Sequence, residues 1–165
     1  MSLCVLYLDF DGVLHPKSAA RSVWTEDSLK LEGDDLFRWI PDLENVLSLF
    51  PDVKVVIHSS WRYLHTEDQI KEKLGSLGER VLGLVSREPG ERYVQILDDA
   101  KSRGVSSIFI LDDDIDACPA SCPELISCHE SLGISDVNVQ KKLHKSLCNF
   151  DVIYPLDNPN PGEIV

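Results

Sequence analysis

The chain has 165 residues, of which 43% are hydrophobic and 27% charged, a composition typical of a folded domain rather than a disordered segment. Its 16 basic and 28 acidic side chains give a formal net charge of −12 with histidine neutral. Such an acidic chain argues against binding along an extended nucleic acid, which usually needs a basic surface. No apolar run approaches the roughly 20 residues that cross a bilayer, and no secretory signal is recognisable, so we expect no membrane partner. We expect a cytoplasmic protein with one domain over residues 1–165, in which residues 155–165 form a Pro-rich tail.

The five cysteines are an odd number, which favours reduced thiols in the cytosol or the nucleus over a disulfide framework. Cys118, Cys122, Cys128 and His129 lie close together in the sequence and raise the question of a zinc site. Structural zinc sites favour cysteine pairs on tight knuckles, and the spacing of Cys118 and Cys122 is only marginally of that kind. The proline that follows each of these two cysteines favours an ordinary loop. A redox role and a metal role both stay open for this segment.

Three short apolar runs, each followed by polar residues, predict strands that are buried on both faces. They cover residues 3–8, 53–57 and 107–111, and the second is rich in β-branched side chains. Residues 81–85 and 125–127 have the same character more weakly and predict two further strands.

Helix signals alternate with these runs. The residues that carry the start and stop signals are Pro41, the possible capping box of Thr66 and Gln69, Pro89 with Gly104, and Ser135. Strands that alternate with helices imply a parallel sheet with right-handed crossovers and helices on both faces, which is a three-layer, Rossmann-like α/β fold. About 25 residues precede Pro41 after the first strand and its loop, enough for a flap but not for a folded cap domain.

Polar side chains that follow the three best strands define a candidate site. In an open parallel sheet, ligands bind outside the carboxyl ends of the strands, so Asp9 and Asp11, the serines after residue 58, and Asp112 should meet at one edge. Carboxylates that converge without basic residues need a cation, and oxygen-only ligands favour Mg²⁺. One aspartate can then attack phosphorus while the other moves protons, and a serine can hydrogen-bond a phosphoryl oxygen.

Simpler explanations exist for two of these segments. Asp11-Gly12 is also a common turn pair. Residues 112–116 resemble the start of a calcium-binding EF-hand loop, but Ala117 and Pro123 stand where that loop needs glycine and glutamate, so the calcium interpretation fails. A turn alone does not explain why three polar clusters follow three strands in this order.

The motifs resemble those of the haloacid dehalogenase (HAD) superfamily of phosphohydrolases. Residues 9–14 (DFDGVL) resemble its first motif, residues 57–60 (IHSS) its second, and residues 111–113 (LDD) its acidic fourth motif. The form Ser-Ser-Trp-Arg at 59–62, and Gly133 after the fourth motif, are most similar to HAD-like domains associated with RNA-repair proteins. The match spans nearly the whole chain in the right order.

The resemblance implies a Mg²⁺-dependent phosphomonoester hydrolase. Asp9 matches the nucleophile that forms an aspartyl-phosphate and also ligates the metal. Asp11 matches the general acid/base, which lends its backbone carbonyl to the metal. Asp112 and Asp113 match the remaining metal-binding acids.

The phosphate-binding residues are less sharply defined by the resemblance. Ser59 matches the phosphate-binding residue of the second motif, with Ser60 as the alternative. The family places Lys, or sometimes Arg, near the start of the helix before the fourth motif, and Arg92 stands there, with Arg87 and Lys101 as alternatives. An arginine fork suits phosphate geometrically.

A site without a cap domain is open, which in this superfamily favours large or exposed phosphorylated substrates such as phosphoproteins or nucleic-acid ends. A small phosphorylated metabolite stays possible if a partner closes the site. Trp61 and Arg62 are expected either to line the entrance or to pack and form a surface ion pair. Two other functions stay open: a non-catalytic module that binds phosphate or protein, and a phosphotransferase with an acceptor other than water.

Overall fold

A computed structural model of the chain describes residues 2–119 and 122–149. The proposed tail at 155–165 lies outside the described residues. Within the described part, the main sheet has five parallel strands in the order β5-β4-β1-β6-β7. Their bounds are β1 Cys4–Leu8, β4 Lys54–Ile57, β5 Val81–Leu84, β6 Ser107–Asp112 and β7 Leu125–Ser127. All five predicted strands are therefore confirmed.

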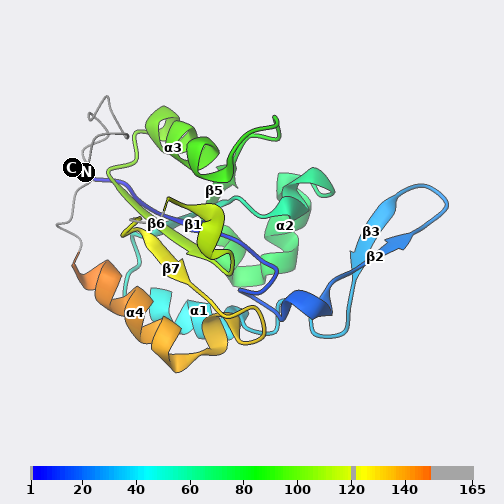
Figure 1. Ribbon diagram of the computed structural model, residues 1–165, viewed down its shortest axis with the longest axis horizontal. Helices are drawn as coiled ribbons and strands as arrows, with labels where there is room; N and C mark the ends of the chain where they lie inside the picture. The colour runs from blue at the N-terminus through cyan, green and yellow to red at the C-terminus, as the bar shows by residue number, and fades with distance from the viewer. Residues whose placement is uncertain (1, 120–121, 150–165) are drawn as a thin grey trace.

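Helices cover both faces of this sheet, as Figure 1 shows with α3 on one side and α1 and α4 on the other. The helix bounds are α1 Ile40–Leu47, α2 Glu67–Leu74, α3 Arg92–Arg103 and α4 Val137–Cys148. Alternate residues of β1 point to opposite faces: Leu6 and Leu8 pack in the core shared with α1, α2 and α4, whereas Val5 and Tyr7 pack in the core beneath α3. The predicted three-layer, Rossmann-like α/β fold without a large cap is confirmed.

Three of the helix-boundary signals predicted from the sequence are present in the structure. The capping box that begins α2 is present, because the Gln69 N–H donates to Thr66 Oγ1 (3.2 Å) and the Thr66 N–H donates to Gln69 Oε1 (2.9 Å). Pro41 lies in the first turn of α1, and Gly104 ends α3 in the left-handed conformation at φ +67°.

Two predicted helix starts are wrong. Pro89 does not begin α3, which starts at Arg92, because the preceding residues form a loop tied by a bond from the Glu88 N–H to Ser86 Oγ. Ser135 does not cap α4; the cap is Asp136, whose carboxylate accepts the Asn138 N–H at 2.8 Å. The Ser135 hydroxyl instead donates to the Leu132 carbonyl within a short 3-10 turn.

The segment between β1 and α1 contains an antiparallel hairpin, β2 Arg21–Trp24 and β3 Leu29–Glu32. It projects away from the main sheet (Figure 1) and carries Trp24, whose side chain is 79% exposed. The sequence predicted a flap here but not strands, since most of these residues are exposed and lack the apolar pattern of a buried strand.

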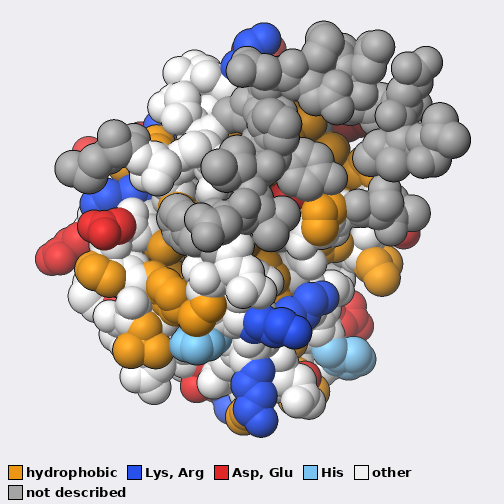
Figure 2. All heavy atoms as spheres, turned by 90° about the vertical axis from the view of Figure 1, so that its left-hand side faces the viewer, with side chains coloured by type: hydrophobic (Ala, Val, Ile, Leu, Met, Phe, Trp, Pro, Cys, Tyr) orange, Lys and Arg blue, Asp and Glu red, His pale blue; other side chains and the backbone are white. Residues whose placement is uncertain are grey.

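Among the described helices, none has the length and apolar character to cross a bilayer. The basic residues Lys141, Lys142, His144 and Lys145 lie on the solvent side of α4. Figure 2 shows basic and histidine side chains beside apolar ones on the face that includes this helix.

Candidate active site

The parallel register brings the ends of β1, β4 and β6 to one edge of the sheet. Leu8 is paired with Ile57 on one side and with Leu111 on the other. The ladder continues beyond the strand, because the Asp9 N–H donates to the Leu111 carbonyl (3.1 Å) and the His58 N–H donates to the Leu8 carbonyl (3.2 Å). The polar residues that follow the three strands are therefore neighbours in space.

Asp9, Asp112 and Asp113 form a group of three carboxylates, from which one oxygen each lies within 4.8 Å of the others. Burial and the adjacent Asp112 raise the pKa of Asp9 well above its usual range, although Arg92 opposes this shift. Burial also raises the pKa of Asp113. Acidic groups in such a position repel one another unless a cation lies between them, so the donor set fits a hard divalent ion.

Of the three acids, Asp112 accepts hydrogen bonds from the largest set of donors described at the site. Its Oδ2 contacts Arg92 Nη1 at 2.7 Å and His58 Nε2 at 2.9 Å, while its Oδ1 accepts the Asp114 N–H at 2.9 Å. Burial alone would raise its pKa, but these donors outweigh burial and lower the pKa of Asp112 to about 2. Asp112 is therefore ionised and fixed in orientation.

His58 is a component of the site that the sequence analysis did not single out. It is completely buried, and burial lowers its pKa, so the neutral imidazole donates its Nε2–H to Asp112. A histidine that ends an otherwise apolar strand is the signal that could have identified it, since a buried imidazole needs a polar partner.

Arg92, at the first position of α3, reaches the carboxylate group, whereas its two alternatives do not. Arg87 donates to the backbone carbonyls of Arg62 (2.7 Å) and His65 (2.9 Å) and so fastens a loop. Lys101 is exposed, late in α3. Of the three cations considered from the sequence, only Arg92 contacts a site acid in the described structure.

Asp11 stands outside the group of three carboxylates and is 27% exposed. His15 Nε2 contacts its Oδ1 at 2.8 Å, and Trp61 Nε1 lies 3.2 Å from each of its two oxygens. The next residue, Gly12, has φ +74°, and a Cβ there would lie 2.5 Å from Asp113 Oδ2. Glycine thus lets the loop after β1 approach the acids that follow β6.

The two candidate serines differ in exposure. Ser59 is buried at the end of β4, and its Oγ accepts the Trp61 N–H at 3.3 Å as the cap of the 3-10 turn Ser60–Tyr63. Ser60 is exposed at the start of that turn. Ser59 directly follows His58, which contacts Asp112.

Trp61 and Arg62 are both buried, so the expectation that Arg62 forms a surface ion pair is wrong. Its guanidinium donates instead to the backbone carbonyls of His58, Ser59 and Ser86, and therefore ties the end of β4 to the loop after β5. Trp61 packs at the site, with its indole N–H on Asp11.

Lys17 is a further residue that the sequence analysis missed. Its Nζ lies 3.3 Å from Asp113 Oδ2, although the side chain is 57% exposed. The hydrogen bond to Asp113 and its charge raise the pKa of Lys17. Its place in the turn Lys17–Ala19, outside every motif, gave no signal for this contact.

Cys118, Cys122, Cys128 and His129 do not gather into a metal site in the described structure, where the three aspartates are the one converging group of three or more such ligands. The Cys122 thiol donates to Glu124 Oε2 at 2.8 Å, and Cys128 is buried. A redox role for this segment, which the sequence left open, stays open.

A protein-family model matches most of the chain. No curated protein and no solved structure matched the chain significantly. The family model described as the HAD domain in Swiss Army Knife RNA repair proteins matches residues 5–139, which run from within β1 into α4 and include all the residues of the site. Together with the parallel sheet and the acids at its carboxyl edge, this match shows that the chain belongs to that family of HAD domains.

Proposed function

We propose that this HAD domain is a Mg²⁺-dependent phosphomonoester hydrolase that forms an aspartyl-phosphate on Asp9. The observation that carries the proposal is the convergence of Asp9, Asp112 and Asp113 beside Arg92 at the ends of parallel strands. Membership of a HAD family supports phosphohydrolase-type chemistry at this position. Oxygen-only ligands suit Mg²⁺, which keeps several waters and binds substrate phosphate.

In the first step, a carboxylate oxygen of Asp9 attacks phosphorus, the new O–P bond forms, and the bond from phosphorus to the leaving oxygen breaks. Asp11 gives its proton to that leaving oxygen. In the second step, water attacks phosphorus, Asp11 takes the proton from the water, and the bond to Asp9 breaks to release inorganic phosphate. Bound Mg²⁺ would neutralise the carboxylates and the phosphoryl oxygens.

Four further residues complete the proposed site. Asp112 and Asp113 would hold the cation together with Asp9 and the backbone carbonyl of Asp11. Arg92 would bind phosphoryl oxygens, since only one of its nitrogens is engaged by Asp112 in the contacts described and a guanidinium carries five N–H groups. Ser59 or Ser60 would donate a hydroxyl hydrogen bond to another phosphoryl oxygen.

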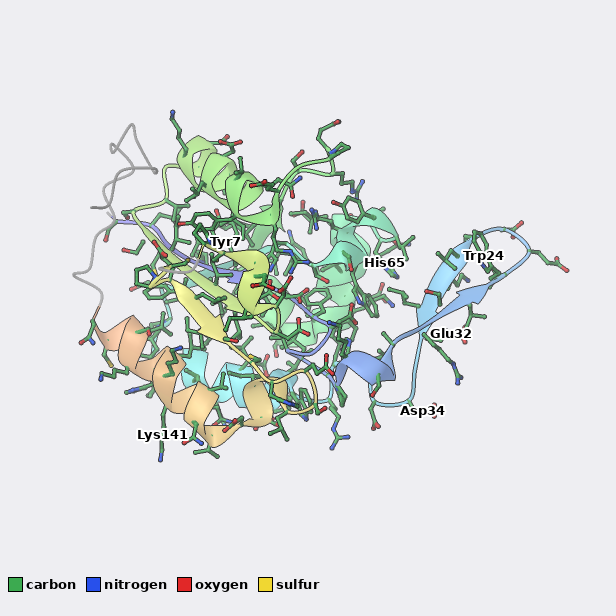
Figure 3. The ribbon with its side chains drawn as sticks, in the orientation of Figure 1. Tyr7, Trp24, Glu32, Asp34, His65 and Lys141 are labelled. Atoms are coloured by element: carbon green, nitrogen blue, oxygen red, sulfur yellow. The ribbon has the colours of Figure 1, made fainter. Side chains whose placement is uncertain are left out.

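The surroundings of the site favour a substrate whose phosphate is exposed or carried by a large molecule. The segment after β1 is a hairpin rather than a folded cap. A groove of about 500 Å³ separates residues 28–32 of this hairpin from α2 and the turn before it, and His65 in its wall stacks on Trp61 at 5.1 Å. Figure 3 shows His65 on the side of the body that faces the hairpin, with Trp24 out on the hairpin.

The matched family takes its description from RNA repair proteins, which makes a terminal RNA phosphate one candidate for this chain. The net charge of −12 argues that contact with such a substrate would be confined to its end. A phosphoprotein, or a small phosphorylated metabolite held with the help of a partner, would use the same chemistry. A cytoplasmic location stays a prediction.

The test is the release of inorganic phosphate from an aryl phosphate with Mg²⁺ and with EDTA. We expect Mg²⁺-dependent release by the wild-type protein and none above background by Asp9→Asn. Asp98→Asn, which removes an exposed carboxylate on α3, is the matched control and should retain activity. Equal rates for wild type and Asp9→Asn would refute the proposal. Adding alcohol acceptors to the same assay would reveal transfer to an acceptor other than water.

A further inference from the structure

The Asp11 carboxylate is held by two neutral donors that come from different parts of the chain. His15 Nε2 contacts Oδ1 at 2.8 Å, and Trp61 Nε1 lies 3.2 Å from both oxygens. We infer that His15 and Trp61 are positioning residues that fix Asp11 for proton transfer, and that the backbone N–H of Phe37 sets the tautomer of His15. This inference rests on the proposed function of Asp11.

The tautomer of His15 follows from its second hydrogen bond. The Phe37 N–H donates to His15 Nδ1 at 3.2 Å. Because a backbone N–H can only donate, Nδ1 must be the acceptor and carries no proton. The ring proton then resides on Nε2, which points at Asp11 Oδ1. A backbone group remote from the reacting atoms thus determines that the imidazole donates to Asp11 rather than accepting from it.

Phe37, whose backbone N–H donates this hydrogen bond, has an unfavourable backbone conformation. It has φ +60°, and within the described residues it is the one non-glycine residue with positive φ. Bulky side chains rarely adopt this region, and such outliers persist only where the surroundings enforce them. Packing of the Phe37 ring holds the residue in this conformation. The ring lies edge-on to three others, with centroid distances of 5.2 Å to Phe10, 5.2 Å to His15 and 5.0 Å to Trp61.

The two oxygens of Asp11 are not equivalent in this arrangement. Oδ1 faces both His15 and Trp61, whereas Oδ2 faces only the shared indole N–H. His15 is fully buried while Asp11 is partly exposed. Because Oδ2 has fewer hydrogen-bond donors, it is the oxygen that gives the proton to the leaving group and later takes it from water.

Two separate segments therefore converge on the Asp11 carboxylate, and a third acts on it through His15. His15 follows the first motif, Trp61 follows β4, and Phe37 precedes α1. A purely structural role for these contacts would affect every substrate equally. Positioning of a general acid predicts a dependence on the leaving group, because a poor leaving oxygen needs the proton during bond cleavage and a good one does not.

The experiment compares kcat/KM for an alkyl phosphate and for 4-nitrophenyl phosphate, since kcat/KM reports on the steps up to formation of the phosphoenzyme. Trp61→Phe keeps a ring but removes the N–H, and His15→Leu removes the donor. We expect each variant to lose about tenfold or more on the alkyl ester and less than about threefold on the nitrophenyl ester. His15→Gln, which restores an N–H donor, should recover part of the loss. His144→Gln, an exposed histidine on α4, is the control.

A second measurement does not depend on activity. Long-range ¹H–¹⁵N spectra of histidine-labelled protein, with His15 assigned from the signals missing in His15→Gln, should show the Nε2–H tautomer. Equal losses on both esters would overturn the positioning role, and an Nδ1–H tautomer would overturn the role of Phe37. If the wild-type protein hydrolysed neither ester, the proposed function would fail while the tautomer result still decided the assignment of His15.

Discussion

His58 donates its Nε2–H to Asp112 Oδ2 across 2.9 Å, although the two residues lie 54 positions apart in the sequence and both are buried. The bond connects the ends of β4 and β6, which are not neighbours in the sheet because β1 lies between them. It therefore spans the strand that carries Asp9. A neutral donor of this kind holds the carboxylate without adding a positive charge that would compete with a cation.

Removal of this donor should lower the stability of the protein. His58→Leu leaves the buried Asp112 carboxylate with Arg92 and the Asp114 N–H alone. A lost hydrogen bond to a charged group lowers the free energy of unfolding by about 1.5–3 kcal/mol. Urea denaturation in EDTA measures the stability, and His129→Leu, an exposed histidine, serves as the control. An unchanged unfolding midpoint for His58→Leu would show that the bond contributes nothing.

A second prediction separates cation binding from folding. Asp113→Asn removes one of the three converging carboxylates and with it a like charge near Asp9. The metal-free protein should keep its stability, but the stabilisation by Mg²⁺ should shrink. A ligand at 100 times its Kd stabilises by about 2.7 kcal/mol, so thermal unfolding with Mg²⁺ and with EDTA resolves the difference.

Asp114→Asn, an exposed neighbour outside the carboxylate group, is the matched control and should respond to Mg²⁺ as the wild type does. An undiminished Mg²⁺ shift in Asp113→Asn would remove that residue from the proposed ligands.

Gly12 and Gly104 offer a controlled test of how closely the loop after β1 approaches the acids. Both have positive φ, +74° and +67°, so alanine meets a backbone penalty of about 1–2 kcal/mol at either position. A Cβ at Gly12 would lie 2.5 Å from Asp113 Oδ2, whereas a Cβ at Gly104 meets nothing within 4 Å. We expect both variants to lose stability, but only Gly12→Ala to lose the Mg²⁺-induced shift in thermal unfolding. A retained Mg²⁺-induced shift in Gly12→Ala would mean that Asp113 can move away from the new methyl group without loss of cation binding.

The sequence was sufficient to predict the sheet and the edge at which the site lies, because both depend on patterns along the chain. Uninterrupted apolar runs such as residues 4–8 identify strands buried on both faces, and parallel pairing places Asp9 and Asp112 at the same edge. Arg92 was one of three candidates that the family resemblance offered, and only the structure shows that it contacts Asp112.

Residues whose contribution depends on side-chain direction could not be found from the sequence. His15 and Lys17 reach the acids only because of how the loop after β1 turns, and no local pattern encodes that turn. The hairpin was missed for a related reason: its strands are held by their own hydrogen bonds and pack little against the body, so apolar periodicity is weak there.

The last prediction concerns the sign of the charge that Arg92 contributes. Its guanidinium lies 2.7 Å from Asp112, where a positive charge opposes a cation and favours an anion. Arg92→Ala should therefore bind Mg²⁺ as tightly as the wild type or more tightly, while it binds inorganic phosphate about tenfold or more weakly, since charge-assisted hydrogen bonds contribute about 1.5–3 kcal/mol. Isothermal titration with each ligand separates the two effects. Lys101→Ala, on the same helix and exposed, should change neither constant. If phosphate affinity were unchanged in Arg92→Ala and fell in Lys101→Ala, the phosphate-binding cation would be Lys101 instead.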